Sequence, residues 1–170
     1  MKDTECIRRL KTEDIVTVCR FVNDNWTSVY QGYVNPSLLT EDGCRQRAMH
    51  LKEDFQSKRL SEYVYTANNQ AAGLLSCGPT EEKDYKDAFE IWRIYIASAY
   101  QGRGIGSQLL KFAEDAAIEQ GYSEILIWAF NNNRHALSFY MKHGYRIDKE
   151  EYLDEPYLAD AVRLMKRIRP

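Results

Sequence analysis

The sequence predicts an α/β fold built on one mixed sheet with helices packed against it. Amphipathic runs with a helical period alternate with short apolar runs along the chain. Two of the apolar runs are separated only by Asn68-Asn69-Gln70, which is typical of an antiparallel hairpin. Another apolar run, residues 89–97, leads through a glycine turn into an amphipathic run, as a strand leads into a helix.

The first half of the chain supplies strands and helices with clear boundaries. Thr12 precedes two acidic residues and an apolar periodic run, the signature of a capped helix that continues to about Trp26. An aromatic connection follows, and the next helix carries its charged residues on the outer face. The expected elements are a strand at 5–10, helices at 12–26 and 40–58, strands at 62–67 and 71–77, and a charged loop at 79–87.

The second half repeats the alternation. We expect a strand at 89–97, a helix at 107–118 that stops at Gly121, a strand at 124–130, a helix at 133–142 ended by Gly144, and closing strands at 145–147 and 161–166. Ligands of open α/β sheets bind where neighbouring strands separate at their carboxyl ends. We therefore expect a ligand between the 89–97 strand, with its glycine turn, and the 124–130 strand.

Composition limits the class of protein. The chain has 170 residues, 44% of them hydrophobic, and a net charge of −2, so we expect a single domain over 1–170 with an ordinary core. Basic residues are scattered, and the one dense cluster, at Arg163 to Arg169, is explained by a solvated strand end, so no nucleic-acid partner is expected. We see no leader or membrane-length run and no metal spacing among the cysteines, and we expect a cytoplasmic protein without metal or membrane partners.

The glycine turn predicts a phosphorylated ligand. Residues 101–106 read Gln-Gly-Arg-Gly-Ile-Gly between a strand and a helix, where backbone N–H groups and the helix dipole favour a phosphate. Gly106 is followed by Ser107-Gln108 rather than Lys-Ser/Thr, which disfavours a nucleoside triphosphate. Position 109 is Leu, which disfavours a dinucleotide. The alternative is a turn that only joins a strand to a helix.

Two motifs together resemble one family. The spacing Gln101-x-x-Gly104-x-Gly106 is similar to the pyrophosphate loop of the GCN5-related N-acetyltransferase (GNAT) superfamily. About thirty residues on, Asn133-x-x-Ala136-x-x-Phe139-Tyr140-x-x-x-Gly144-Tyr145 resembles the closing motif of that superfamily. The resemblance covers roughly residues 60–167. It implies a single mixed, mostly antiparallel sheet of six to seven strands with about four helices, an acetyl-CoA or coenzyme A cofactor, acetylation of a primary amine, and a possible homodimer.

The same resemblance assigns the cofactor contacts. Asn133, Ala136 and Tyr140 share one helix face about 10 Å long, which suits a thin ligand. By resemblance Asn133 binds the pantetheine arm. The strand at Ile94, Tyr95 and Ile96 is kinked in this superfamily, and its backbone pairs with pantetheine like an added strand. The expected cofactor-binding residues are Ile94, Tyr95, Ile96, Gln101, Gly102, Arg103, Gly104, Ile105, Gly106, Ser107, Asn133, Ala136 and Tyr140.

Two residues are candidates for the chemistry. The resemblance implies that Tyr140 protonates the leaving thiolate, and a tyrosine hydroxyl holds a proton at neutral pH. Its alternative role is an amphipathic core residue. Glu90 lies in an alternating run that places it on one face with Trp92 and Ile94, where apolar neighbours raise its pKa and suit it to act as a base, directly or through water. Its alternatives are solvation or pairing with Lys86.

The acceptor is less well defined. Trp26, Tyr30 and Trp92, with the acidic 79–87 loop, are candidate substrate-binding residues that can hold a cation, and their alternative is packing over the second helix. The sequence Glu-Ile-x-Arg-Ile-Tyr-Ile at residues 90–96 is similar to that of bacterial spermidine/spermine-type acetyltransferases, which slightly favours small amines over peptide amines as acceptors. His135 and His143 are expected to face solvent or cap a helix. The rival function is a CoA-binding sensor without turnover.

Overall fold

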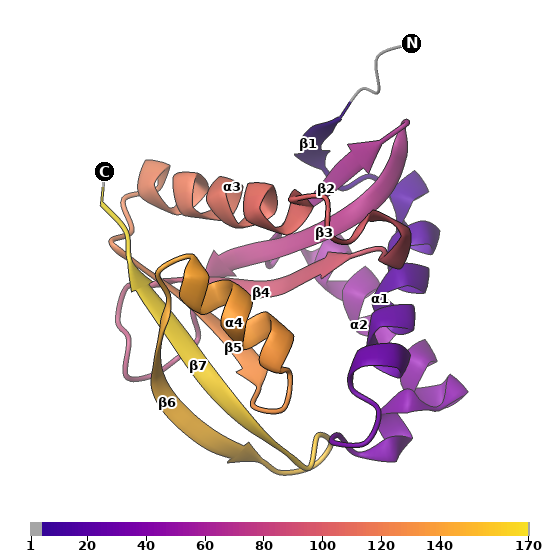
Figure 1. Ribbon diagram of the computed structural model, residues 1–170. Coiled ribbons are helices and arrows are strands. Elements are labelled where there is room, and N and C mark those ends of the chain that lie inside the picture. Colours follow the sequence, from indigo (N-terminus) through magenta and orange to yellow (C-terminus); the bar gives the residue numbers. More distant parts are fainter. Residues whose placement is uncertain (1–4, 170) are drawn as a thin grey trace.

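A computed structural model describes residues 5–169 and shows one seven-stranded sheet. The strands are β1 (Cys6–Arg9), β2 (Ser61–Ala67), β3 (Gln70–Pro79), β4 (Phe89–Ile96), β5 (Glu124–Phe130), β6 (Arg146–Leu153) and β7 (Ala159–Arg167). Their order is β1-β2-β3-β4-β5-β7-β6, and every neighbouring pair is antiparallel except β4 and β5, which are parallel. The mixed, mostly antiparallel sheet is confirmed (Figure 1).

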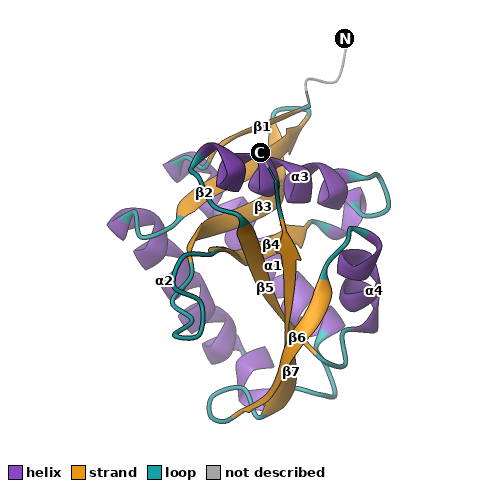
Figure 2. Ribbon diagram, turned by 90° about the vertical axis from the view of Figure 1, so that its left-hand side faces the viewer, coloured by secondary structure: helices purple, strands orange, loops and turns teal. Residues whose placement is uncertain are grey.

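Four α-helices cover the two faces of the sheet. They are α1 (Ile15–Val29), α2 (Glu41–Ser57), α3 (Ile105–Glu119) and α4 (Arg134–Lys142). In Figures 1 and 2, α1 and α2 lie on one side of the sheet, and α3 and α4 lie on the other. The two larger apolar clusters follow this division: Leu109 and Leu137 belong to the α3 and α4 side, and Val18 and Leu51 belong to the α1 and α2 side. None of the described helices is long and apolar enough to cross a membrane.

The elements differ from the sequence prediction mainly at their ends. The strand expected at 145–147 continues as β6 to Leu153, although its residues are mostly exposed and charged. An edge strand of this kind has no apolar alternation, so its length depends on pairing with β7 rather than on its own pattern. α3 begins at Ile105, within the glycine turn, two residues earlier than expected.

β4 and β5 pair only over their first halves. The parallel register joins Phe89, Glu90 and Ile91 to residues 125–127 and then ends, although both strands continue. The two strands separate towards their carboxyl ends (Figure 1). This separation leaves an unpaired edge of β4 beside a gap that the sheet itself does not fill.

A β-bulge changes which side chains of β4 face each side of the sheet. Ser76 pairs with Arg93 but Cys77 pairs with Ile91, so Trp92 is an extra residue. Phe89 and Ile91 therefore pack on the α3 and α4 side together with Ile94 and Ile96, whereas Arg93 contacts Asp54 of α2. The expectation that Glu90 shares a face with Ile94 is wrong, because the bulge interrupts the alternation and Ile94 packs on the same side as Phe89 and Ile91.

Candidate active site

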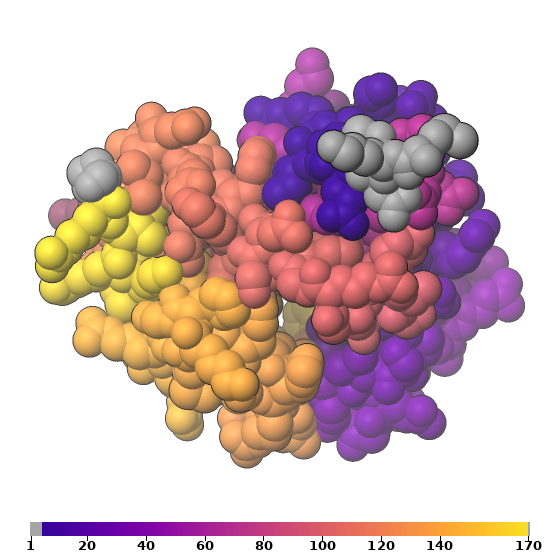
Figure 3. Space-filling model, turned by 45° about the horizontal axis from the view of Figure 1, so that its top comes forward, coloured from indigo at the N-terminus to yellow at the C-terminus, as the bar shows by residue number. Residues whose placement is uncertain are grey.

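A cavity of about 880 Å³ occupies the gap between β4 and β5. Its opening is visible in Figure 3 where the indigo and purple N-terminal part, the salmon glycine turn and the orange start of α4 meet. All three candidate substrate residues line it, as does Tyr140, whereas Glu90 and Arg103 do not. The expected cofactor residues on its wall are Ile94, Tyr95, Ile96, Gln101, Gly102, Gly104, Ile105, Gly106, Ser107, Asn133, Ala136 and Tyr140.

The glycine turn presents backbone donors at the start of α3. Gly102 and Gly104 have left-handed φ values of 74° and 76°, which L side chains rarely adopt. No side chain from residues 5–169 caps α3 at Gly104, so the N–H groups of the first turn are available to a ligand. A Cβ on Gly106 would lie 3.3 Å from Cζ of Phe139, so glycine allows α4 to pack closely here. The turn fits an anionic phosphate group.

Gln101 and Arg103 contribute to the turn in different ways. The Gln101 side chain donates to the carbonyl of Ile96 at 3.2 Å, and Asn25 of α1 donates to the same carbonyl at 3.0 Å. These bonds fix the end of β4 to the turn and to α1. Arg103 is exposed, with its guanidinium 5.2 Å from the ring centre of Tyr100. Its predicted phosphate contact stays a prediction.

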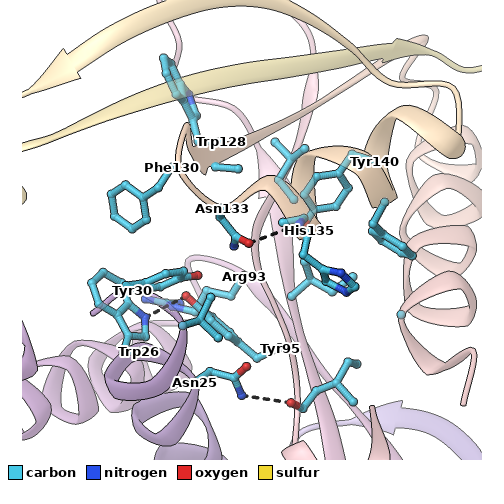
Figure 4. Close-up of a pocket in the computed structure, with 18 of the residues that line it drawn as sticks. Asn25, Trp26, Tyr30, Arg93, Tyr95, Trp128, Phe130, Asn133, His135 and Tyr140 are labelled. Carbon is cyan, nitrogen blue, oxygen red and sulfur yellow. Dashed lines mark hydrogen bonds between the residues drawn. The ribbon is translucent and has the colours of Figure 1, made fainter. Parts of the chain in front are cut away.

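Residues on one face of α4 line the opposite wall of the cavity. Asn133 caps the helix by accepting a hydrogen bond from the Ala136 N–H at 3.3 Å. Tyr140 follows two turns later and is only 6% exposed. Burial raises the pKa of Tyr140 above its ordinary range, and the neighbouring Tyr95 adds to the effect. In Figure 4, Asn133 and Tyr140 lie across the cavity from Trp26, Tyr30 and Tyr95. The Tyr140 hydroxyl is therefore a group that retains its proton inside the cavity.

The candidate aromatic residues of α1 are held by other side chains. The indole N–H of Trp26 donates to Tyr95 Oη at 2.9 Å, and the guanidinium of Arg47 lies 3.9 Å from the Trp26 ring centre. Tyr30 packs edge-on against Trp26 with ring centres 4.8 Å apart. One face of Trp26 therefore already carries a cation, which leaves Tyr30 as the more available of the two rings.

The far end of the cavity is formed by residues that the sequence did not single out. Trp128 of β5 donates through its indole N–H to Glu82 at 3.0 Å, and both residues line the cavity. Arg163 of β7 donates to the other oxygen of Glu82 at 2.7 Å and also to Asp84 and Asp148. Arg163 is 2% exposed, so assigning it to a solvated cluster is wrong. It anchors the 79–87 loop beside the cavity.

Glu90 lies behind this loop rather than on the cavity wall. It is 5% exposed and accepts a hydrogen bond from Thr80 Oγ1 at 2.6 Å, so it is neither solvated nor paired with Lys86. Burial raises its pKa to about 7, against the lowering effect of the Thr80 bond. Thr80 Oγ1 also accepts from the backbone N–H of Glu82 at 3.1 Å. Thr80 thus connects Glu90 to the loop that reaches the cavity.

The tertiary structure determines the surroundings of two further side chains, His143 and Cys77. His143, expected to face solvent or cap a helix, is half-buried and lies within hydrogen-bond distance of Ser107 Oγ, 36 residues away in the sequence. No local pattern could have revealed this contact. Cys77 is fully buried, and burial raises the pKa of its thiol to about 12, which makes a nucleophilic thiolate unfavourable.

A sheet opened between β4 and β5, a glycine turn with uncapped N–H groups at the start of α3 and an enclosed tyrosine on α4 are the features of an acetyltransferase fold and site. The model of the acetyltransferase (GNAT) family matches residues 20–145, and the chain belongs to this family. An uncharacterised protein, YxbD of Bacillus subtilis (strain 168), is 35% identical over 159 residues, 92% of this chain and 85% of the relative.

Other relatives have names that state an activity. A spermidine N(1)-acetyltransferase of Thermoplasma acidophilum is 26% identical over 155 residues, 87% of this chain and 92% of the relative. The solved structure of a PaiA N-acetyltransferase from Thermoplasma acidophilum in complex with coenzyme A is 22% identical, has a TM-score of 0.77 and covers 96% of this chain and 99% of its own. That structural likeness confirms the fold.

Proposed function

We propose that the protein transfers an acetyl group from acetyl-CoA to a primary amine by direct attack in a ternary complex. The observation that carries the proposal is a single cavity joining the phosphate-binding turn, the Tyr140 face of α4 and an acidic, aromatic end. Membership of the acetyltransferase family supports it, as does the coenzyme A bound to the PaiA enzyme of similar fold.

The residues present fit the cofactor. The uncapped first turn of α3 is placed to hold the pyrophosphate, and the unpaired edge of β4 at Ile94–Ile96 is placed to pair with pantetheine. Asn133 lines the same cavity and is proposed to bind the pantetheine arm. The cofactor supplies the activated acyl group when bound, and the chain positions it by these contacts.

Two side chains are proposed to move protons. Tyr140 holds its proton in the cavity and is proposed to give it to the departing sulfur. Glu90, whose pKa is about 7, is proposed to take the proton that the amine loses. Because Glu90 does not line the cavity, this proton reaches it through an intervening water on the Thr80 side of the loop.

The acceptor is proposed to be a small cationic amine rather than a peptide amine. The acceptor end of the cavity has the indoles of Trp92 and Trp128 and the carboxylates of Glu82 and Glu151, with Arg163 already paired to Glu82, Lys149 to Glu151, and Arg59 stacked on Trp92. Aromatic faces and carboxylates both favour an ammonium group. The name of the Thermoplasma spermidine acetyltransferase supports this class of acceptor.

The test is a thiol-release assay with acetyl-CoA and a panel of polyamines, amino acids and peptide amines, beside calorimetry of CoA binding. We expect release with an amine of the polyamine class. Tyr140→Phe should lower kcat by about a hundredfold without weakening CoA binding, because the lost group acts on the leaving thiolate. Tyr145→Phe is the matched control, since Tyr145 is also a buried tyrosine but does not line the cavity.

Each result has a defined meaning. Binding of CoA without release from any amine would refute the enzyme and favour the sensor. Failure to bind CoA would refute the interpretation of the glycine turn. Release with peptide amines alone would overturn the proposed acceptor class and keep the enzyme.

A further inference from the structure

His143 joins the end of α4 to the first turn of α3. Its Nδ1 lies 2.8 Å from the carbonyl oxygen of Phe139, and its Nε2 lies 2.9 Å from Ser107 Oγ. The imidazole also packs against the Phe139 ring, with centres 4.4 Å apart. Ser107 lines the cavity beside the uncapped N-terminus of α3. A side chain at the edge of the phosphate-binding turn is thus held by a titratable group.

The two hydrogen bonds fix where the protons lie. A carbonyl oxygen only accepts, so Nδ1 of His143 carries hydrogen and donates to Phe139. In a neutral imidazole Nε2 is then an acceptor, and the Ser107 hydroxyl donates to it. The Ser107 hydrogen is directed away from the cavity in this state, and its oxygen presents only lone pairs to an arriving anion.

A second proton on His143 reverses the bond. Nε2–H then donates to Ser107 Oγ, and the serine hydrogen is free to donate to a phosphate oxygen. The imidazolium charge also lies next to the positive end of α3, where a bound anion compensates for both. The charged form of His143 therefore suits an occupied turn, and the neutral form suits an empty one.

The charges around His143 do not replace the ligand in this role. The charged residues on the turn, α3, α4 and β7 are Arg103, Lys111, Glu114, Asp115, Glu119, Arg134, Lys142, Asp160, Arg163, Lys166 and Arg167. Glu114 is paired with Lys166 at 2.9 Å, and Lys111 is paired with Asp115 at 2.8 Å. The two carboxylates are therefore already neutralised, and Arg103 and Lys142 oppose a further positive charge. A bound pyrophosphate supplies the negative charge that favours the imidazolium.

We propose that His143 is a positioning residue for the cofactor, and that binding of the CoA pyrophosphate at Ser107 takes up one proton on His143. This inference rests on the proposed function, which places CoA at the turn. It predicts that affinity for the cofactor decreases as the pH rises, since histidine changes charge between about pH 5 and 8.

The test is calorimetry with dephospho-CoA, which keeps the pyrophosphate but lacks the 3′-phosphate, a group that itself titrates near neutral pH. Titrations at pH 7.5 in two buffers with different ionisation enthalpies give the number of protons taken up. We expect measurable proton uptake with the wild-type protein and weaker binding of dephospho-CoA at pH 8 than at pH 6. Pantetheine has no pyrophosphate and should take up none.

Two variants separate positioning from folding. Ser107→Ala removes the hydroxyl but keeps the charge of the pyrophosphate, so proton uptake should fall below the wild-type value and dephospho-CoA should bind about tenfold more weakly at pH 6. His143→Gln keeps an amide donor towards Ser107 at every pH, so its affinity should not change between pH 6 and pH 8. A purely structural role for His143 would not change the number of protons.

The results distinguish this inference from the proposed function. Binding of dephospho-CoA without proton uptake, or uptake that is undiminished in Ser107→Ala, would overturn the role of His143 while leaving the cofactor in place. No binding of dephospho-CoA at any pH would overturn the cofactor assignment and this inference with it.

Discussion

Glu90→Gln should stabilise the protein at pH 8 and not at pH 4.5. Glu90 is buried with one hydrogen-bond donor, Thr80, and its pKa rises from the ordinary value of 4.5 to about 7. This rise in pKa corresponds to a decrease of about 3 kcal/mol in the free energy of unfolding when Glu90 ionises in the folded protein. Glutamine has the same shape, can still accept from Thr80, and never ionises.

The sign follows from the two states of the protein. Below about pH 4.5 the carboxyl is protonated in both the folded and the unfolded chain, and its contribution to stability is fully present. Between pH 4.5 and about 7 the unfolded chain ionises first, so stability falls as the pH rises. Above pH 7 the loss is complete. The wild-type protein should therefore lose about 3 kcal/mol across this window that Glu90→Gln does not lose.

Urea unfolding at pH 4.5, 6 and 8 measures the difference, with melting temperatures as a second readout. For a chain of this size about 3 kcal/mol is roughly 6 to 12 °C in Tm at pH 8. Glu150→Gln is the matched control, because Glu150 is an exposed carboxylate on β6 and should change stability little at any pH. Equal stability of Glu90→Gln and wild type at pH 8 would show that Glu90 does not ionise in an unfavourable site.

The same variant tests the proposed base. If Glu90 takes the proton of the amine, Glu90→Gln lowers kcat by about a hundredfold while it raises stability at pH 8. Because kcat falls while stability rises, the loss of activity cannot be caused by unfolding. Unchanged kcat across pH 6 to 9 would remove Glu90 from the mechanism and leave it as a buried structural carboxylate.

Two other substitutions test what holds the site together. Arg163→Met should lower the free energy of unfolding by about 3 to 5 kcal/mol, measured by urea unfolding, because Glu82, Asp84 and Asp148 then lack their shared cation. A loss below about 1 kcal/mol would show that other contacts hold the 79–87 loop. Gly104→Ala should cost about 1 kcal/mol in stability because φ is 76° there, although a Cβ meets nothing within 4 Å, and CoA binding by calorimetry should weaken with it; an unchanged Tm would refute the strain.

Much of the fold could be predicted from the sequence because its signals are local. The Asn68-Asn69 turn of the hairpin and the glycine stop after α3 depend on residues a few positions apart. The helix cap expected at Thr12 is wrong, because Thr12 lies in a 3-10 turn and α1 begins at Ile15 without a side-chain cap. Interruptions of the strand pattern were harder to predict from the sequence. The bulge at Trp92 reversed the faces of β4, and β6 extended to Leu153 because its neighbour β7 supplies the hydrogen bonds. Neither event leaves a local sequence signal.

The sequence by itself determined the family, the glycine turn before α3 and the position of α4, since each depends on glycine conformation or on short spacing along one helix. Only the tertiary structure decided that Arg163 is buried among carboxylates, that His143 reaches Ser107 and that Glu90 lies outside the cavity wall. These are contacts between residues far apart in the chain, and the burial that sets their charge states exists only once the sheet has formed.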